Sequence, residues 1–542
     1  MTGSPKQWFA LLFLFAAVAY GSASDIYLAQ NASGANTGAD CADAHAYTFF
    51  NSSANWGGGA SQIGPGTTVH LCGTFSGSPG QQLLVFQGSG ASGNPITLHF
   101  ENGAVMSAPY WSAQGAINTN GNTWLTIDGG TNGKIQNTSN GTSGATCLNG
   151  PCSTRQDSRF VFISGCSTCN IEVTNLSLIN IYVHTPNVGD TMPGDNGVEG
   201  VFFSGNHSNI NVNNVVCHDA VICIDGWGNN ISLSNNELYN CNRCIVFGSN
   251  VPTSNFAVHD SYIHDFSNWD DPSTAFHHDG IHLFPNSGNG NMSGVALYNN
   301  QFANPGKGYN TAFMYLEGSF SAPKIFNNAC ILTSSQANPC IMAGYDGGAS
   351  STISGAIVAN NTCFGGNTSN GYCYTLGPGY SNVTFANNVG TQGGSLLAFT
   401  GSSTPTMIDH NMYENICADS GACNMFGYHG SDYTSFPSWK TALPASSGQE
   451  TNSVFNTMSN LKISTSDGQL QSGSPGIGAG ANLSNLGIAA LNSGKPLTVG
   501  VHATATGTQR PSSGAWDIGA YSYSTASGGA PAPPTGLSAA AQ

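Results

Sequence analysis

The chain has 542 residues, of which 39% are hydrophobic and only 7% charged, and acidic residues outnumber basic ones by 27 to 11. The resulting formal charge of −16 excludes a typical nucleic-acid binder, because such proteins neutralise phosphates with lysine and arginine. It also disfavours a strongly anionic glycan unless a cation intervenes. Length alone allows one large domain or several, since elongated β architectures exceed the usual domain size.

The first segment, residues 1–24, has the features of a secretory signal peptide. Lys6 provides a positive charge, residues 8–20 form an apolar core, and small residues follow up to a cleavage site near Asp25. No later apolar run reaches the roughly 20 residues of a membrane helix. The sequence therefore predicts a mature protein that is secreted, extracellular or periplasmic, and has no membrane span.

The 16 cysteines fall into pairs that are close in sequence. An even number in a secreted chain predicts disulfides. The expected pairs are Cys41/Cys72, Cys147/Cys152, Cys166/Cys169, Cys217/Cys223, Cys241/Cys244, Cys330/Cys340, Cys363/Cys373 and Cys417/Cys423. Two of them have the CxxC spacing of half a zinc site, but 71 residues separate them, so disulfides are favoured and no metal site is assigned.

Short apolar strands recur around a two-residue step, usually Asn-Asn. Its copies are Asn213-Asn214, Asn235-Asn236, His259-Asp260, Asn299-Asn300, Asn327-Asn328, Asn360-Asn361, Asn387-Asn388 and His410-Asn411. Spacings between second residues are 22, 24, 40, 28, 33, 27 and 23. A base period of this length indicates a solenoid. A β-propeller is the alternative, but its blades need about 40 residues each.

Asn at these steps suits a turn, because it tolerates the left-handed conformation and can stack into a hydrogen-bonded ladder. Each repeat also carries a second short strand that ends in a turn. Several short strands per coil predict an all-β fold, a single parallel β-helix. We expect it to span residues 25–525, with an N-terminal cap and first coil over 25–80, a closing segment over 470–525 and a flexible tail over 526–542.

This pattern resembles the right-handed parallel β-helix of the pectate-lyase-like superfamily, whose secreted members act mostly on polysaccharides. The opening stretch, residues 25–75, resembles the cap and first coil of bacterial members. The stretch DIGAYSY, residues 517–523, resembles their closing segment, although Ser522 stands where Glu is usual. The resemblance implies a fold and a secreted protein, and fold does not fix function.

The stretch FHHDGIHLF, residues 276–284, lies in the longest regular interval of the repeat. Long loops on rigid scaffolds are where binding and catalytic residues concentrate. Its DGI resembles the NTDGID motif of polygalacturonase-type hydrolases, but His282 replaces the final Asp and the family's later motifs are missing. Only Asp279 is carried over by this resemblance.

Aligning the second strands on their closing turns predicts the register of this region. One predicted column contains Asp225, Phe247, Phe284 and Glu317, and the column two residues earlier contains Cys223, Ile245, His282 and Tyr315. Between them Ile224, Val246, Leu283 and Leu316 should point into the core, because strand side chains alternate. Asp225, His282, Tyr315 and Glu317 should then face outward, with His282 and Glu317 in adjacent coils about 5 Å apart.

A glycosidase needs two carboxyl groups flanking the scissile bond. The predicted catalytic pair is Asp279 and Glu317, with His278 and His282 orienting them. Gly280 allows a turn that would place Asp279 at the cleft edge. Four further residues are predicted to bind substrate: Asp225, also the reserve carboxylate, Trp269 and Tyr315 as flat faces for sugar rings, and Lys307.

Two other functions remain open. A polysaccharide lyase would abstract a proton α to a uronate carboxylate with a Lys or Arg base and use Ca²⁺, for which Asp270, Asp271 and Asp279 are the available ligands. Arg243 and Lys324 are expected to be solvated surface instead. The third function is a non-catalytic glycan-binding or adhesion β-helix.

The preferred prediction is a monomeric, secreted glycoside hydrolase that acts on an extended polysaccharide and requires no cofactor. Glu199, with Asp190 and Asp195, is expected in another loop over the same cleft.

Overall fold

The structure is a computed structural model. It describes residues 25–140, 156–183, 197–266, 278–285, 291–304, 311–332, 339–344, 352–365, 372–377, 379–391, 395–401, 405–420, 424–464, 467–488 and 510–523. The predicted signal peptide, residues 1–24, and the predicted tail, 526–542, lie outside these residues. No helix within the described ranges has the length and apolar character needed to cross a membrane.

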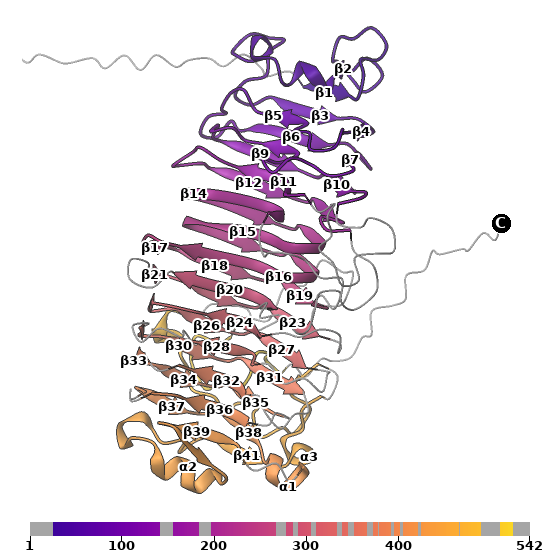
Figure 1. Cartoon of the computed structure of the whole chain (residues 1–542). Coiled ribbons are helices and arrows are strands. Elements are labelled where there is room, and N and C mark those ends of the chain that lie inside the picture. The colour runs from indigo at the N-terminus through magenta and orange to yellow at the C-terminus, as the bar shows by residue number, and fades with distance from the viewer. Residues whose placement is uncertain are drawn as a thin grey trace, which may run out of the picture.

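The strands stack into an elongated solenoid, in which nearly every pair is parallel and joins strands of successive coils (Figure 1). Connections between parallel strands of one sheet are right-handed almost without exception. The predicted right-handed parallel β-helix is therefore confirmed. Its strands form three faces. Three long strands continue from one face to the next: β14 (Val198–Asn213), β15 (Val216–Ser234) and β16 (Glu237–Ser249).

The first face is where the predicted catalytic cluster lies. Its other strands are β5 (Leu84–Val85), β8 (Ile117–Asn118), β11 (Ser158–Ile163), β20 (Asp279–Pro285), β24 (Ala312–Leu316), β28 (Ile341–Ala343), β32 (Tyr372–Leu376), β36 (Ser395–Phe399), β39 (Phe426–Tyr428) and the antiparallel β40 (Ser431–Tyr433).

The second face follows the first in each coil. Its other strands are β1 (Ile26–Ala29), β2 (His45–Ala46), β3 (Thr68–Leu71), β6 (Ile96–Phe100), β9 (Leu125–Asp128), β12 (Ile171–Thr174), β18 (Phe256–His259), β22 (Ala296–Tyr298), β26 (Lys324–Phe326), β30 (Ile357–Ala359), β34 (Thr384–Ala386) and β37 (Met407–Asp409). A narrow sheet lies at the turn before it: β17 (Thr253–Ser254), β21 (Met292–Ser293), β25 (Phe320–Ser321), β29 (Ile353–Ser354) and β33 (Tyr380–Ser381).

The third face completes the coil. Its other strands are β4 (Thr74–Ser76), β7 (Val105–Ala108), β10 (Lys134–Asn137), β13 (Ser177–Ile179), β19 (Tyr262–His264), β23 (Gln301–Asn304), β27 (Ala329–Leu332), β31 (Thr362–Gly365), β35 (Val389–Gly390), β38 (Met412–Glu414) and β41 (Val454–Asn456). Short helices connect or follow the last strands, namely α1 (Ile416–Ser420), α2 (Phe436–Ala442) and α3 (Met458–Leu461).

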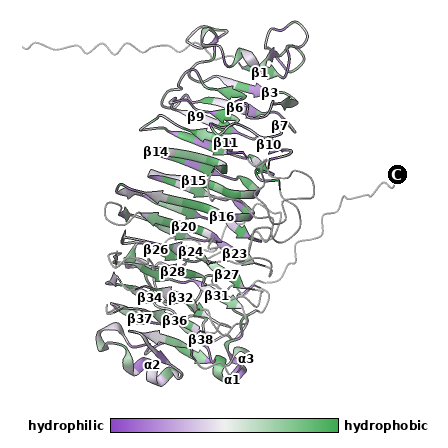
Figure 2. Cartoon of the chain, in the orientation of Figure 1, coloured by the Kyte–Doolittle hydropathy of each residue, from purple (hydrophilic) through white to green (hydrophobic). Residues whose placement is uncertain are grey.

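The core runs along the inside of the solenoid. Side chains alternate in and out along each strand, so green and purple residues follow one another in many strands of Figure 2. On the first face, Ile224, Ile245, Ile281 and Met314 pair in register from coil to coil, and each is at most 1% exposed. Stacked aliphatic columns of this kind bury apolar area continuously, which is the main favourable term in folding.

The predicted asparagine ladder is present at the turn between the second and third faces. The first residue of the later steps is left-handed, with φ of 55° at Asn299 and 54° at Asn327. The second residue points inward, and the Nδ2 atom of Asn300 donates to Oδ1 of Asn328 at 3.0 Å, as Asn328 does to Asn361. The ladder satisfies buried backbone N–H groups as well, so it stabilises each turn.

The predicted alignment of this ladder is wrong by one residue in two coils. Asn214 and Asp260 are themselves the left-handed residues, with φ of 56° and 53°. The inward positions that follow them are occupied by Val215 and Ser261, which are buried. The error arises because a turn column accepts Asn, Asp or His, so the letters alone do not show which member of the pair turns.

The disulfide prediction is confirmed for six pairs. These are Cys41–Cys72, Cys166–Cys169, Cys217–Cys223, Cys241–Cys244, Cys330–Cys340 and Cys363–Cys373. Cys417 is also disulfide-bonded. The predicted partners Cys147, Cys152 and Cys423 lie outside the described residues.

The segment predicted to close the domain packs along the side of the solenoid. Arg510 is buried, and its Nε donates to Asn327 Oδ1 at 3.1 Å while its NH1 and NH2 groups donate to the carbonyls of Asp517 and Gly519 at 3.0 and 2.6 Å. Trp516 packs with Phe326 in a small apolar cluster. The ladder turns of the later coils are therefore covered, while the helices α1 and α2 lie between the last strands and α3 follows β41.

Candidate active site

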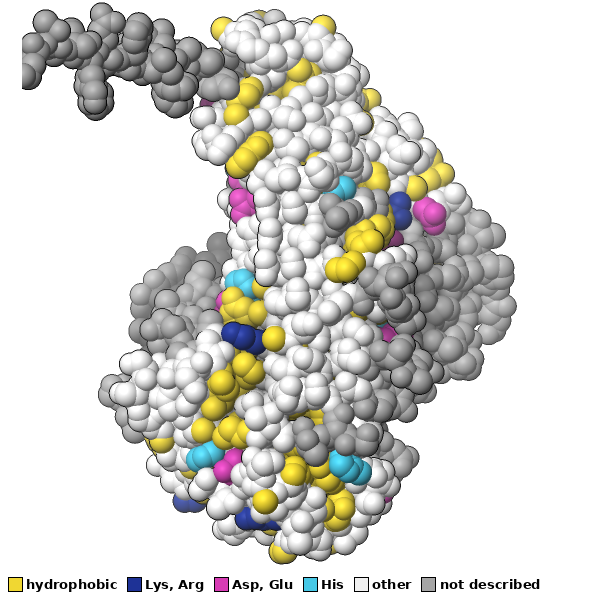
Figure 3. All heavy atoms as spheres, turned by 90° about the vertical axis from the view of Figure 1, so that its left-hand side faces the viewer, with side chains coloured by type: hydrophobic (Ala, Val, Ile, Leu, Met, Phe, Trp, Pro, Cys, Tyr) yellow, Lys and Arg dark blue, Asp and Glu magenta, His cyan; other side chains and the backbone are white. Residues whose placement is uncertain are grey.

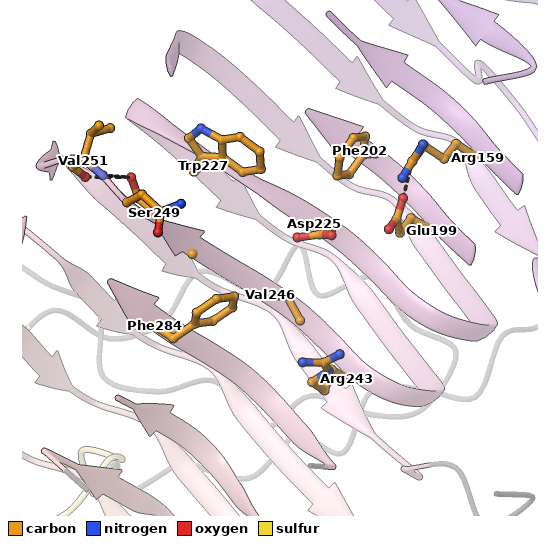
Figure 4. Close-up of a pocket in the computed structure, with 12 residues that line it drawn as sticks. Arg159, Glu199, Phe202, Asp225, Trp227, Arg243, Val246, Ser249, Val251 and Phe284 are labelled. Carbon is orange, nitrogen blue, oxygen red and sulfur yellow. Dashed lines mark hydrogen bonds and ion pairs between the residues drawn. The ribbon is translucent and has the colours of Figure 1, made fainter. Parts of the chain in front are cut away.

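A pocket on the first face brings together four ionisable and three aromatic side chains. Its volume is about 370 Å³, and β11, β14, β15, β16 and β20 supply these seven residues (Figure 4). The ionisable residues are Arg159, Glu199, Asp225 and Arg243, and the aromatic ones are Phe202, Trp227 and Phe284. Two of the 11 basic residues of the whole chain thus line one small cavity.

Glu199 is held as a hydrogen-bond acceptor at one end of the pocket. The Nε of Arg159 donates to Glu199 Oε2, and the backbone N–H of Gly197 donates to Oε1 at 2.9 Å. The Arg159 guanidinium lies 3.9 Å from the centre of the Phe202 ring, a cation–π geometry. These bonds hold both carboxylate oxygens of Glu199 in fixed positions.

Asp225 lies beside Glu199 in the adjacent strand. Burial is the main reason that the pKa of Asp225 is raised to about 8, and the charge of Glu199 raises this pKa further, against the opposing effect of Arg243 and Arg159. Asp225 is therefore protonated at neutral pH. Two neighbouring carboxyl groups in different surroundings are the arrangement from which separate acid and base roles arise.

The aromatic side chains form the walls of the pocket. Figure 4 shows Phe202 and Trp227 on the same side as Asp225, with Phe284 across from them near Val246. The Phe284 ring lies over the backbone of Gly248, where a Cβ atom would come within 2.3 Å of it. Glycine at this position therefore allows the ring to reach the pocket. Flat apolar rings beside carboxyl groups suit a sugar, which has apolar faces and polar edges.

The predicted cluster around His282 lies next to this pocket. His282 Nε2 is 3.0 Å from Glu317 Oε2, and His282 Nδ1 is 3.6 Å from Asp279 Oδ2. The imidazole stacks on Tyr315 with ring centres 4.8 Å apart and contacts the Phe284 ring at 5.0 Å. The predicted closeness of His282 and Glu317 is confirmed, and His282 bridges the two predicted catalytic carboxyl groups.

The expected position of Asp279 at the cleft edge is wrong. Asp279 is the first residue of β20 and is 0% exposed, and its Oδ1 accepts the N–H of Ala312 at 3.1 Å. Gly280 continues the strand. A Cβ atom at this position would lie only 2.9 Å from the ring of Phe302 and would also meet the carbonyl of Phe313, so glycine leaves the room that both groups need. Burial raises the pKa of Asp279 to about 8, and Arg243 opposes that rise. Glu317 has a side chain that is 31% exposed.

The other residues predicted for the site are either buried or lie outside the described residues. His278 is buried, with Nε2 3.4 Å from the side-chain nitrogen of Asn242. Tyr315 is 4% exposed, so its ring supports His282 and is not a platform for a sugar. Trp269 and Lys307 lie outside the described residues.

The predicted register is right in one part and wrong in another. His282 pairs with Tyr315 and Leu283 with Leu316, as expected. Asp225, however, pairs with Val246, which pairs with His282, so Val246 is in the outward column. Phe247 takes the inward position and is 1% exposed. Gly226 and Gly248 lie within strands and do not begin turns, so they do not mark equivalent positions of successive coils.

Three pocket residues had a weak or misleading sequence signal. Arg243 was expected to be solvated, yet it is only 7% exposed and lies in register with Asp279. Lys324, expected to be surface as well, is partly buried, and its Nζ lies 3.4 Å from the Gly487 carbonyl. Arg159 has no sequence motif that points to a site, and Glu199, which the sequence predicts in a loop, belongs to β14. The scarcity of arginine was the one signal that could have identified Arg159 and Arg243.

Two groups of potential metal ligands occur among the described residues. His70, His99 and Glu101 have donor atoms within 4.8 Å of one another. Cys166, Cys169 and His207 also cluster, but the two sulfurs are bonded to each other. Neither group lines the first-face pocket. Asp270 and Asp271, the suggested Ca²⁺ ligands, and Asp190 and Asp195 lie outside the described residues.

No protein-family model matches the chain, and no curated protein matches it in sequence. Three solved structures to which the fold of this chain is similar are those of carbohydrate-active enzymes. The GH136 lacto-N-biosidase from Eubacterium ramulus is 11% identical, with a TM-score of 0.46 over 80% of this chain and 68% of that one. Pectate lyase Pel9A is 15% identical, with a TM-score of 0.41 over 93% and 98%. A mannuronic acid specific polysaccharide family 6 lyase from human gut microbiota is 15% identical, with a TM-score of 0.34 over 66% and 77%.

Proposed function

We propose that this protein is a secreted glycoside hydrolase that cleaves a polysaccharide in the first-face pocket, with Asp225 as the proton donor. The observation that carries the proposal is the raised pKa of Asp225, about 8, beside an arginine-bound Glu199. A glycosidase acid must be protonated at the working pH in order to protonate the leaving oxygen. Asp225 meets this requirement and lines the pocket, whereas Asp279 is fully buried.

Glu199 takes a proton from the water whose oxygen bonds the sugar carbon as the glycosidic bond breaks, and its negative charge stabilises the positive charge developing on the sugar ring. Its bonds to Arg159 and Gly197 keep its oxygens in place as Asp225 gives up its proton. Arg243, which lines the same pocket, stabilises the carboxylate that Asp225 becomes. Phe202, Trp227 and Phe284 hold the sugar and exclude bulk water other than the attacking molecule, which strengthens these electrostatic interactions.

Glu317 is proposed to contact the same glycan further along, and His282 to orient Glu317. Three coils separate Asp225 from Glu317, hence about 14 Å at the backbone. Carboxyl groups that flank one glycosidic bond lie within about 9.5 Å of each other. Asp279 and His278 are proposed to support His282 and the strand from beneath the surface, without touching substrate.

The second candidate is a polysaccharide lyase. It is favoured by Arg159 and Arg243, because an arginine can neutralise a uronate carboxylate and can act as the base. Among the described residues, no lysine, histidine or tyrosine lines this pocket, so Arg243 would have to be the base. Ca²⁺ would be needed only under this alternative. The hydrolase proposal gives a role to both carboxyl groups of the pocket, whereas β-elimination uses only Asp225, to protonate the leaving oxygen, and leaves Glu199 without a role.

A substrate panel separates these functions. The mature chain is incubated with neutral polysaccharides and with polyuronides, while reducing ends and absorbance of unsaturated uronates are both recorded. We expect new reducing ends without absorbance. A rise of both signals would contradict hydrolysis in favour of a lyase, and binding without either signal would identify a non-catalytic glycan-binding protein.

A further inference from the structure

A column of left-handed residues runs along the turn between the first and second faces. Each member precedes the second-face strand of its coil, and these strands pair in register. Five consecutive members have positive φ: Trp124 57°, Asn170 51°, Asn209 61°, Asn230 54° and Asn255 58°. The column is therefore a second ladder, on the outside of the solenoid.

The asparagines of this column bond to one another. The Nδ2 of Asn255 donates to Asn230 Oδ1 at 2.8 Å, Asn230 donates to Asn209 at 3.1 Å, and Asn209 donates to Asn170 at 3.0 Å. An amide has two N–H donors and an oxygen with two lone pairs, so each ladder bond uses only part of its capacity. The row thus presents amide groups at intervals of about 4.8 Å.

Trp124 interrupts this pattern. Asn readily adopts the left-handed conformation, whereas a bulky residue there is a genuine outlier. Such backbone strain persists where function requires it. An asparagine at this position would extend the ladder by one coil and relieve the strain. The presence of an indole instead indicates that its ring has a use at the end of the amide row.

An open groove of about 460 Å³ lies where Trp124 meets the row. Besides Trp124 and Asn209, its polar lining includes Thr126, Glu172, Asn211 and Ser232, and Asn211 Nδ2 donates to Glu172 Oε1 at 2.9 Å. Glu172 is its one charged lining residue among those described, and no basic side chain lines it. Figure 3 shows the side of the solenoid toward which β17 and β21 lie, where charged side chains are sparse. The groove is thus unsuited to an anion.

We propose that this groove is a second glycan-binding site, separate from the first-face pocket, that holds a neutral polysaccharide chain. Trp124 provides a flat apolar face for one sugar ring, and the amides and hydroxyls bond the hydroxyl groups of the following rings. The coil spacing of about 4.8 Å is close to the length of one pyranose unit, so consecutive sugars meet consecutive coils. The site does not depend on the proposed catalytic activity.

The test is affinity electrophoresis in gels that contain xylan, galactomannan, mixed-linkage β-glucan or polygalacturonate. The Asp225→Asn chain is used, so that the probe is not degraded. We expect retardation by at least one of the neutral glycans and a loss of affinity of about tenfold or more in Asp225→Asn/Trp124→Asn. Because asparagine suits the left-handed position, this second change should maintain or raise the melting temperature, which excludes misfolding as the cause.

Asn382→Gly is the matched control, since Asn382 is an exposed left-handed residue of the same column far from the groove. It should leave retardation unchanged. The proposal is overturned if none of the neutral glycans retards the chain, if only polygalacturonate does, or if Trp124→Asn binds as tightly as its parent. Retardation that depends on Trp124 supports the site even if the wild-type chain cleaves nothing, so the two proposals fail separately.

Discussion

His282 Nε2 lies 3.0 Å from Glu317 Oε2 and so joins two adjacent coils on the first face. The bond is buried at the histidine and partly exposed at the glutamate, whose side chain is 31% accessible. It places a carboxylate on the surface in a fixed orientation without placing it in the pocket. The contact is therefore a positioning interaction, and the catalytic proposal rests on Asp225.

Replacing Asp225 with Asn should abolish cleavage. Asparagine keeps the shape of the side chain but cannot donate the proton, and general acid catalysis contributes about 10²- to 10⁴-fold. Reducing-end assays on a substrate found in the panel would measure the loss. Glu317→Gln is the matched control, because it neutralises a carboxylate on the same face, and it should retain more than a tenth of the activity. A severe loss in Glu317→Gln with an active Asp225→Asn would restore the pair predicted from the sequence.

Activity should fall as the pH rises through about 8. Asp225 must be protonated to act, and its raised pKa of about 8 sets the upper limb of the profile of kcat/KM against pH. The positive charge of Arg243 lowers this pKa, so Arg243→Gln should move the upper limb to higher pH whatever its effect on the maximal rate. A limb that stays in place, or moves to lower pH, would argue against Asp225 as the titrating acid.

Asp279 should make the folded state less stable as the pH rises. Its pKa is about 8 in the fold against 3.8 as the reference, so the folded chain keeps a proton that the unfolded chain releases. The contribution of this group is greatest below about pH 4 and is lost progressively up to about pH 8. Asp279→Asn keeps the Oδ1 acceptor for Ala312. At pH 8 it should be more stable than wild type by a few kcal/mol, on the order of the free energy that wild type loses because its unfolded chain releases the Asp279 proton.

Melting temperatures of both chains at pH 5 and pH 8 provide the measurement. The difference between the chains should grow with pH. An equal fall in the melting temperatures of the two chains between pH 5 and pH 8 would mean that Asp279 does not carry the buried proton.

Arg510 should hold the C-terminal segment on the solenoid. Its buried guanidinium has a pKa lowered to about 10 by burial, and it bonds Asn327 and two carbonyls of its own segment. Arg510→Ala leaves these acceptors without their donor and should cost about 1–3 kcal/mol for each acceptor that stays buried and unsatisfied. Limited proteolysis should then cut near residues 510–523 while the coils stay intact. Arg510→Lys should be cut nearly as readily, because one ammonium cannot reproduce the planar fork. Resistance of both variants would contradict this role.

The solenoid itself could be predicted because its signals are local and repeated. Asn-Asn steps, short apolar strands and cysteines close in sequence recur with each coil, so the fold class and six of the disulfides follow from patterns of a few residues. The closeness of His282 and Glu317 was predictable for the same reason, because it depends only on the register of two consecutive coils. Prediction failed where a glycine was taken for a turn, as at Gly248 and Gly280.

The sequence by itself determined the repeat, and with it the elongated sheet faces and the outward direction of Asp225 and His282. Only the tertiary structure decided which polar side chains meet. Arg159 and Arg243 lie 84 positions apart in the sequence and become neighbours of one carboxyl pair because four successive coils stack there, through β11, β14, β15 and β16. Burial, which raises the pKa of Asp225 and removes Asp279 from the surface, is a property of the packed coil and cannot be read from either residue's neighbours in sequence.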